Sequence, residues 1–352
     1  MTVPQTMRAS VLTEVGVIEL QERPVPVPAA GEVLVQVASV GVCGSDVHYY
    51  EHGRIAHFVV ESPLVLGHEL SGTIVAVGAD VAPERIGERV AVEPQKPCRT
   101  CEQCKSGAYN LCPDMEFFAT PPIDGAFCEY VTIGADFAFA VPDDVSDHAA
   151  ALIEPLSVGL AAVRTGGVAP GQTVLVAGGG PIGLIAAQAA RAFGATTVVV
   201  AEPDASRREL VAAHGFTPLD PMSEQTTDLG AHVFIDASGV VPAIQNGLRS
   251  VRSGGTVVLV GSADVVPLSV GDIAMREVNV TGTFRYTNTW PLAIDLLRSG
   301  AVELDGLVTH EYGLDQVEQA LNAEATPSSL KRMVLPGTAT VEHPELATRS
   351  AS

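Results

Sequence analysis

The spacing of apolar and polar residues changes along the chain and predicts two kinds of structure. Residues 32–40, EVLVQVASV, alternate apolar and polar positions, which is typical of a strand with one buried face. In the second half, short apolar runs alternate with helical segments. We predict a helix over 242–251 and strands at 173–177, 196–201, 232–238, 255–261 and 278–283. This alternation predicts an α/β fold with a doubly wound parallel sheet.

A glycine-rich turn follows the strand predicted at 173–177. Gly178, Gly180 and Gly183 match the spacing G-x-G-x-x-G, and a helical segment comes next. We interpret the first glycine as the tight turn, the second as the closest approach to a pyrophosphate and the third as the site of helix–strand packing. Because strand, glycines, helix and second strand occur in this order, the turn predicts a dinucleotide-binding Rossmann unit.

The acid at the tip of the second strand bears on the choice of dinucleotide. Glu202 would accept hydrogen bonds from the adenosine ribose hydroxyls and would repel a 2′-phosphate, which favours NAD over NADP. Arg207 and Arg208 follow within six residues and could contact either the adenine side or a phosphate.

Length and composition set limits on the fold and the partners. The chain has 352 residues, which exceeds what one hydrophobic core usually serves, so we expect two domains. Its formal net charge of −21 repels polyphosphates and anionic lipid surfaces, so we expect neither nucleic acid nor membrane as a partner. The start MTVPQTMRAS lacks a charged leader followed by an apolar stretch, and no run of about twenty apolar residues occurs. We therefore expect a soluble cytoplasmic protein.

Four of the six cysteines lie within fifteen residues of one another. Cys98, Cys101, Cys104 and Cys112 read C-x2-C-x2-C-x7-C, a spacing that lets four thiolates converge on one tetrahedral Zn²⁺. Disulfides and an iron–sulfur cluster are the alternatives. Disulfides suit an exported protein, and an electron-transfer path would need a second cluster. A site closed by four thiolates has no open coordination position, so we expect this zinc to be structural.

A second group of metal-binding residue types is scattered along the first half. Cys43 lies in a turn after the strand at 32–40, and His68 and Glu69 lie in a glycine-flanked turn before another apolar strand. A sulfur, an imidazole and a carboxylate suit a catalytic zinc with a water in its open position. Each residue alone is weak evidence, because a lone cysteine is often a small core residue. We assign Cys128, in the apolar run GAFCEYVTI, to the core.

The chain resembles the zinc-dependent medium-chain dehydrogenases, and within them the polyol group typified by sorbitol and xylitol dehydrogenases. The resemblance runs along nearly the whole chain. It rests on CGSDVHYYEHGRI, GHELSGTIVAVG, ATPPIDGAF, ALIEPLSVGLAAV, GGGPIG and GTFRYTNTWPLAIDLLRSG. It implies a β-rich, GroES-like catalytic domain over residues 1–153, a NAD-binding Rossmann domain over 154–287, and a C-terminal part, 288–352, that returns to the catalytic domain with helices near 289–300 and 314–323.

The resemblance also assigns roles to individual residues. It implies a catalytic zinc at Cys43, His68 and Glu69, with Glu154 touching the bound water. It implies a proton relay through Ser45 and His48, with the water beside Glu154 as the alternative route. Polyol contacts are implied for Tyr49, Phe117, Thr120, Glu154, Arg285 and Tyr286. NAD contacts are implied for Gly178, Gly180, Ile182, Gly183, Glu202, Arg207, Val260, Phe284 and Arg285.

The implied activity is oxidation of a sorbitol- or xylitol-like polyol to the ketose with NAD as hydride acceptor, by a homotetramer or homodimer. Two features depart from the family pattern. Animal sorbitol dehydrogenases generally lack the four-thiol lobe, which is complete here and resembles the microbial branch. Glu202 stands where many members have Asp.

Alternative functions follow from the same residues. One is a related zinc dehydrogenase acting on threonine, a simple secondary alcohol or a cyclic polyol. The stretch FRYTNTW favours an open-chain polyol, because a simple alcohol would leave the donors of Arg285 and Tyr286 unpaired. The other is a non-catalytic protein that binds zinc and NAD, against which the complete set of catalytic ligands argues.

Overall fold

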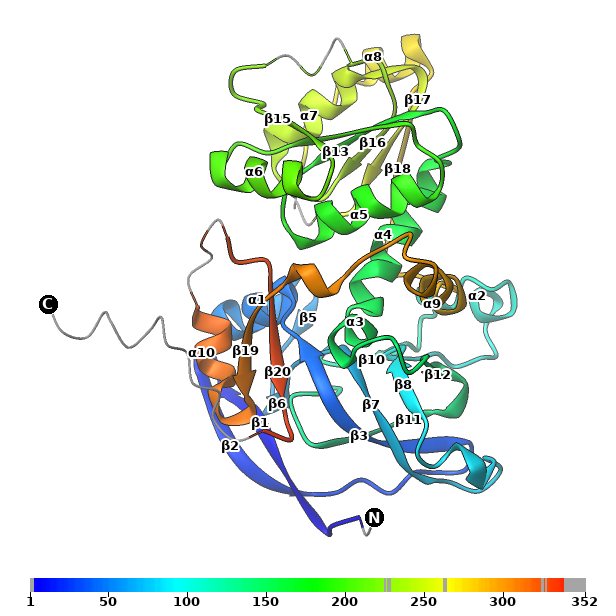
Figure 1. Ribbon diagram of the computed structural model, residues 1–352, viewed down its shortest axis with the longest axis vertical. Helices are drawn as coiled ribbons and strands as arrows, with labels where there is room; N and C mark the ends of the chain where they lie inside the picture. Colours follow the sequence, from blue (N-terminus) through cyan, green and yellow to red (C-terminus); the bar gives the residue numbers. More distant parts are fainter. Residues whose placement is uncertain are drawn as a thin grey trace, which may run out of the picture.

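Two large β-sheets, one above the other, organise the chain in a computed structural model (Figure 1). The structure describes residues 3–224, 226, 229–261, 265–323, 326 and 328–338. The end of the predicted C-terminal part, 339–352, lies outside these residues. Among the described residues, no helix is long and apolar enough to cross a membrane.

The lower sheet is mostly antiparallel and is built largely from the first half of the chain. It has seven strands in the order β12-β8-β7-β3-β20-β19, with β11 also paired to β3. Their bounds are β3 (Glu32–Gly41), β7 (Glu69–Val77), β8 (Arg89–Val92), β11 (Tyr130–Gly134), β12 (Ala138–Ala140), β19 (Val308–Gly313) and β20 (Lys331–Leu335). The C-terminal strands β19 and β20 therefore lie in the sheet of the first half.

Shorter strands surround this sheet. A three-stranded sheet has the order β2-β1-β6, and two strand pairs are β9 with β10 and β4 with β5. The bounds are β1 (Thr6–Glu14), β2 (Val17–Pro24), β4 (Arg54–Ile55), β5 (Phe58–Val59), β6 (Leu64–Val65), β9 (Gln95–Lys96) and β10 (Glu116–Phe117). Together with the large sheet they form the predicted β-rich half.

The upper sheet has six parallel strands in the order β15-β14-β13-β16-β17-β18. The strands are β13 (Thr173–Ala177), β14 (Thr197–Ala201), β15 (Thr217–Leu219), β16 (Ala231–Asp236), β17 (Val251–Leu259) and β18 (Asn279–Gly282). The strand order reverses on either side of β13, which is the topological switch point where open α/β sheets bind ligands. The predicted doubly wound sheet is confirmed.

The predicted strand boundaries in this sheet differ most from the structure at β17. The helix expected over 242–251 is α7 (Val241–Ser250), and Val251 already begins β17, four residues before the predicted start at 255. Val251 pairs with Ala231 of the neighbouring β16 and is buried. A β-branched residue with a buried pairing partner adopts the strand, whatever the helical pattern before it.

The remaining helices cover the sheets and link them. They are α1 (Gly44–His52), α2 (Glu102–Lys105), α3 (Asp147–Ala151), α4 (Ile153–Gly166), α5 (Pro181–Ala192), α6 (Ala205–Ala213), α8 (Val270–Arg276), α9 (Trp290–Arg298) and α10 (Val317–Asn322). Short 3-10 helices are η1 (Pro83–Arg85), η2 (Tyr109–Leu111), η3 (Ala135–Phe137), η5 (Asp305–Leu307) and η6 (Leu314–Gln316). The helices predicted near 289–300 and 314–323 are α9 and the pair η6 and α10.

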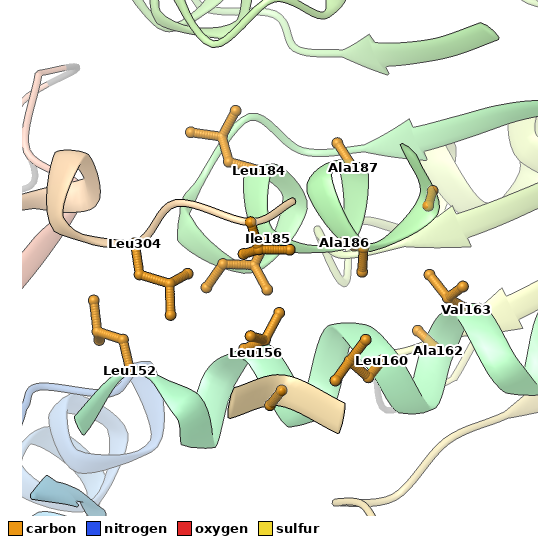
Figure 2. Packing of buried hydrophobic residues seen from close by; sticks show 14 of the residues in the cluster. Leu152, Leu156, Leu160, Ala162, Val163, Leu184, Ile185, Ala186, Ala187 and Leu304 are labelled. Carbon is orange, nitrogen blue, oxygen red and sulfur yellow. The ribbon is translucent and has the colours of Figure 1, made fainter. Parts of the chain in front are cut away.

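Helix α4 lies between the two sheets and packs along α5. Figure 2 shows Leu156 and Leu160 of α4 facing Ile185 and Ala186 of α5. The helices approach so closely that a Cβ on Gly159 would lie 2.9 Å from Cγ2 of Ile185. Complete burial of a leucine stabilises the fold by about 2–3 kcal/mol. This contact therefore fixes the nucleotide half relative to the first turn of α4, which carries Glu154. The predicted boundaries at 153/154 and 287/288 stay predictions.

Candidate active site

The predicted zinc ligands come together where β3 ends and β7 begins. These strands are antiparallel, and Gly41 pairs with Glu69 in their register, so Cys43 lies beside the start of β7. The ligand atoms of Cys43, His68 and Glu69 all lie within 4.8 Å of one another. A Cβ on Gly41 would fall 2.0 Å from Oε2 of Glu69, so the space for this carboxylate exists because residue 41 is glycine.

This donor set fits a catalytic zinc. One thiolate, one imidazole and one carboxylate form a three-ligand set that leaves a fourth position open. His68 is buried, and its Nδ1 has no hydrogen-bond partner among the described residues. Because three donors that are buried or half-buried converge on one position, a bound ion would stabilise the cluster. Cys43, His68 and Glu69 are the residues that would hold it.

Asp46, for which the sequence predicted no role, holds the cluster in place through hydrogen bonds. Its Oδ2 accepts a hydrogen bond from the backbone N–H of Cys43 at 2.9 Å, and its Oδ1 accepts one from that of Gly67 at 2.9 Å. Oδ1 also lies 3.6 Å from Nδ1 of His68. Asp46 is fully buried. The sequence signal was its position three residues after Cys43, at the start of α1, where a carboxylate caps free N–H groups.

Lys331 is a second partner that the sequence did not reveal. Its Nζ donates to Oε1 of Glu69 at 2.6 Å and to the carbonyl of Val42 at 3.1 Å, and both charged side chains are buried. Burial alone would lower the pKa of Lys331, but the charges of Glu69, Cys43 and Glu154 and the hydrogen bond to Glu69 together raise it. Lys331 reaches the site because β20 pairs with β3.

Glu154 lies in the first turn of α4 and is held by a tyrosine. Its Oε1 accepts a hydrogen bond from the hydroxyl of Tyr286 at 2.7 Å, and both side chains are buried. Burial raises the pKa of Glu154 to about 7, against the opposing effects of His68 and of the Tyr286 hydrogen bond. The cluster of three ligand residues does not include Glu154. Its contact with a zinc-bound water stays a prediction.

The residues predicted to contact the polyol lie around the same cluster. The guanidinium of Arg285 lies 3.9 Å from the ring centre of Phe117, and that ring lies 5.5 Å from the ring of His68. Burial raises the pKa of Tyr49, while the nearby charges of Arg285 and His68 and a hydrogen bond with Thr120 lower it. Side chains from four separate segments therefore line one region next to the predicted zinc site.

The predicted relay residues lie on α1. Ser45 is half-buried near the start of the helix. His48 is exposed, and its ring stacks on that of His52 with 4.5 Å between the ring centres. Their part in proton transfer stays a prediction.

The four-cysteine cluster has the geometry of a closed metal site. The four sulfur atoms lie within 4.8 Å of one another, and all six cysteines of the chain are free thiols. Backbone N–H groups point at the sulfurs: Cys98 N lies 3.3 Å from Cys112 Sγ, and Cys101 N lies 3.4 Å from Cys98 Sγ. Such N–H groups stabilise thiolates. Hydrogen bonds from Thr100 lower the pKa of Cys98 to about 6, whereas burial raises the pKa of Cys104 and of Cys112. These residues fit a structural zinc. Cys128 is buried in the core, as predicted.

The glycine turn has the shape that a dinucleotide needs. Gly178 has a φ of 102°, which favours glycine, and a Cβ on Gly183 would lie 1.8 Å from the carbonyl oxygen of Gly178. At Gly180 an added Cβ would meet only Nη1 of Arg207, at 3.9 Å, so the turn is open on that side. Helix α5 begins at the next residue, and its N-terminus is suited to a phosphate. The turn therefore fits NAD.

Glu202 holds this turn in place. Its Oε2 accepts a hydrogen bond from Gly179 N at 2.7 Å, and its Oε1 accepts one from Asp204 N at 3.0 Å. Arg208 donates to the carbonyls of Glu202 and Pro203. The arginine whose side chain lies beside the glycine turn is Arg207. A carboxylate has further lone pairs for ribose hydroxyls.

The other residues predicted to contact NAD lie beside the sheet. Ile182 is in the first turn of α5, Val260 follows β17, and Phe284 is half exposed after β18. Their contacts with NAD stay predictions.

Comparison with known proteins gives matches along most of the chain. Residues 29–143 match the family model described as alcohol dehydrogenase GroES-like domain, and residues 181–299 match zinc-binding dehydrogenase. A sorbitol dehydrogenase from Bacillus subtilis (strain 168) is 44% identical over 95% of this chain and 99% of its own. One from Bos taurus is 44% identical over 91% of this chain and 93% of its own. The crystal structure of 2R,3R-butanediol dehydrogenase from Bacillus subtilis superposes with a TM-score of 0.85 at 30% identity, covering 94% of this chain and 99% of the other.

Proposed function

The chain belongs to the zinc-dependent medium-chain dehydrogenases, in their polyol group, and we propose that it oxidises one hydroxyl of a sorbitol-like sugar alcohol to a ketone, with NAD as the hydride acceptor. The proposal rests on the proximity of two sets of residues, the metal-ligand cluster and the side chains that can bind a polyol. The ligand cluster of Cys43, His68 and Glu69 lies beside Arg285, which offers several donors to the hydroxyls of one substrate. The hydroxyl of Tyr286 donates to Glu154 and can still accept a hydrogen bond.

When bound, zinc supplies the Lewis acidity that lowers the pKa of a substrate hydroxyl, and NAD supplies the hydride acceptor. The chain itself holds and orients the polyol. Arg285 and Tyr49 interact electrostatically, which supports placing both beside one substrate, where each can donate a hydrogen bond to a hydroxyl. The cation–π contact with Phe117 keeps the guanidinium in place. This fixed array places one carbinol carbon in register for transfer.

We assign proton transfer to the carboxyl group of Glu154. Because burial raises its pKa to about 7, this carboxyl group can both accept and release a proton near neutral pH. The hydroxyl of Tyr286 orients it from one side. The half-buried Ser45 and the exposed His48 on α1 are the alternative route.

A second candidate is oxidation of a smaller secondary alcohol or vicinal diol. The solved 2R,3R-butanediol dehydrogenase, at 30% identity, favours it. Against it, Arg285 is half-buried over the ring of Phe117, and burial lowers the pKa of its guanidinium. A diol without further hydroxyls would leave those donors unsatisfied, so the polyol is preferred.

The test is formation of NADH, followed by absorbance, with sorbitol, xylitol, ribitol, mannitol, galactitol, erythritol, threonine and 2-butanol. Zinc is counted in the same preparation by elemental analysis. We expect the highest kcat/KM with an open-chain polyol of five or six carbons. Activity confined to 2-butanol or threonine would favour the second candidate. Bound zinc and NAD without NADH formation on any compound would indicate a non-catalytic protein.

We further propose a homodimer or homotetramer in the cytoplasm. The upper sheet ends in β18, an edge strand with unpaired backbone groups on one side, which supports pairing with a second copy. Six free thiols support a reducing compartment. Light scattering of the purified chain gives the oligomeric state.

A further inference from the structure

The four-cysteine lobe, residues 98–112, is hydrogen-bonded to the segment 284–288, here called the polyol loop. Nδ2 of Asn110 donates to the carbonyl of Phe284 at 2.7 Å. The hydroxyl of Tyr109 accepts from the backbone N–H of Asn288 at 2.8 Å, and the Asn288 side chain donates to the carbonyl of Gly107 at 3.3 Å. The lobe therefore holds the polyol loop by hydrogen bonds near both ends of the loop.

A further hydrogen bond comes from just before the lobe and holds the middle of the polyol loop. Nε2 of the buried Gln95 donates to the carbonyl of Tyr286 at 3.2 Å and to Oε1 of Glu93 at 2.8 Å. The same Glu93 oxygen accepts from the hydroxyl of Tyr109 at 2.8 Å. Lobe and polyol loop thus share one connected, partly buried network of polar groups.

The polyol loop needs such support because its backbone is strained. Arg285 has a φ of 55° and Asn288 a φ of 52°, so two non-glycine residues in the left-handed region flank the middle of the loop. Residues in this region persist where the surrounding structure determines them. Without its hydrogen bonds to the lobe, the loop would relax, and the side chains of Arg285 and Tyr286 would leave their places.

We propose that the four-cysteine lobe positions the polyol-binding side chains, with Asn110 and Tyr109 as its positioning residues. The inference rests on the proposed function and extends it, because it gives the structural metal a part in recognising the polyol. Thiolates converging on one ion would hold residues 98–112 rigid, and the hydrogen bonds would pass that rigidity to the backbone of Arg285 and Tyr286. The affinity for the polyol then depends on Asn110 and Tyr109, which do not contact the polyol.

The fluorescence of a tryptophan next to the polyol loop can report on the contact between lobe and loop. Trp290, its only tryptophan, follows the polyol loop directly. It is fully buried, and its ring lies 4.9 Å from that of Tyr286. If the loop relaxes, the emission of Trp290 shifts to longer wavelength and becomes accessible to acrylamide, whether or not the protein turns over a substrate.

The experiment compares Asn110→Asp with Ser106→Ala in the zinc-loaded full-length protein. The aspartate keeps the size of the side chain but turns its donor into an acceptor facing the carbonyl of Phe284. Ser106 is an exposed residue of the same lobe whose hydroxyl donates only inside it, to the carbonyl of Gln103 at 3.0 Å, and it serves as the control. We expect Asn110→Asp to raise the KM for the polyol about five- to tenfold, as loss of a hydrogen bond implies, with kcat little changed. Its Trp290 emission should shift, and Ser106→Ala should match the wild type in both.

Removal of the lobe metal gives an independent measurement. Cys112→Ser should shift the Trp290 emission in the same direction, and elemental analysis should show loss of one zinc per chain. Equal KM values and equal Trp290 spectra for Asn110→Asp and the control would overturn the proposal. If the wild type oxidises no polyol, the proposed function fails, and the Trp290 spectra still decide whether the lobe holds the loop. If Asn110→Asp does not fold, Tyr109→Phe takes its place, with the same two outcomes.

Discussion

Nζ of Lys331 lies 2.6 Å from Oε1 and 2.5 Å from Oε2 of Glu69, although 262 residues separate the two along the chain. Both side chains are almost completely withdrawn from water. Glu69 is also a member of the ligand cluster with Cys43 and His68. The carboxylate is thus shared between a fixed lysine and the position of the proposed catalytic zinc. Lys331 supplies the positive charge that this buried carboxylate needs before the metal binds.

Replacing Lys331 by Met should destabilise the metal-free protein more than the zinc-loaded protein. Without lysine or metal, Glu69 is a buried charge without a partner, which costs about 3 kcal/mol. With zinc bound, the ion still pairs with the carboxylate. Thermal unfolding of both forms measures the difference. The double variant Lys331→Met/Glu69→Gln should recover most of the stability of the metal-free form, and an equal loss in both forms would contradict this account.

Cys43→Ala should abolish turnover, because the ligand cluster loses its sulfur, while NADH binding stays nearly intact. The glycine turn and Glu202 lie in the other sheet and do not depend on Cys43. Elemental analysis should show zinc falling from two ions to one per chain, and fluorescence titration should give an unchanged Kd for NADH. Retained turnover in this variant would show that the catalytic site is misassigned.

Tyr286→Phe should move the acidic limb of the kcat/KM profile to higher pH. The Tyr286 hydroxyl donates to Glu154 and so stabilises its ionised form, which lowers the pKa of that carboxyl from a still higher value. Loss of one hydrogen bond of about 1 kcal/mol raises the pKa by about 0.5–1 pH unit. Because proton acceptance needs ionised Glu154, activity then begins at a higher pH. Glu154→Gln is the control and should lack this limb. A limb at the same pH in Tyr286→Phe would exclude Glu154 as the titrating group.

Glu93→Gln should stabilise the protein at pH 8 and have little effect at pH 5. Burial raises the pKa of Glu93 to about 7, so between about pH 4.5 and 7 the folded chain holds a proton that the unfolded chain has lost. Stability is therefore fully present below this window and is lost as the pH rises through it. Glutamine keeps an acceptor for Tyr109 and Gln95 without the charge. We expect a gain on the order of 2 kcal/mol at pH 8, measured by urea unfolding at both pH values. An equal effect at the two pH values would refute the ionisation of Glu93.

Glu202→Ala should weaken NAD binding and narrow the preference for NAD over NADP. The substitution removes the acceptor for Gly179 N and Asp204 N, and it removes the charge that would repel a 2′-phosphate. Hydrogen bonds to a carboxylate are worth about 1.5–3 kcal/mol, so the KM for NAD should rise about ten- to a hundredfold. Initial rates with each dinucleotide measure both effects. Arg208→Ala is the matched control, since Arg208 donates to two backbone carbonyls next to Glu202. A ratio of NAD to NADP activity that stays the same in Glu202→Ala would assign the preference to other residues.

The sequence by itself determined the features whose parts are close neighbours along the backbone. The four cysteines lie within fifteen residues, so their spacing alone brings the sulfurs together. The glycine turn was readable for the same reason, because a strand, three glycines and a helix follow one another directly. In such segments backbone geometry and local chemistry leave few arrangements.

Only the tertiary structure decided which distant side chains meet. Cys43 reaches Glu69 through the register of β3 with β7, and Lys331 reaches it through the pairing of β20 with β3. The hydrogen bond from Tyr286 to Glu154 and the grip of Asn110 on the polyol loop likewise join segments more than a hundred residues apart. Strand register and helix packing are set by the burial of whole apolar faces, a property of the complete core. No local pattern around Asn110 or Lys331 could therefore show which residue each would contact.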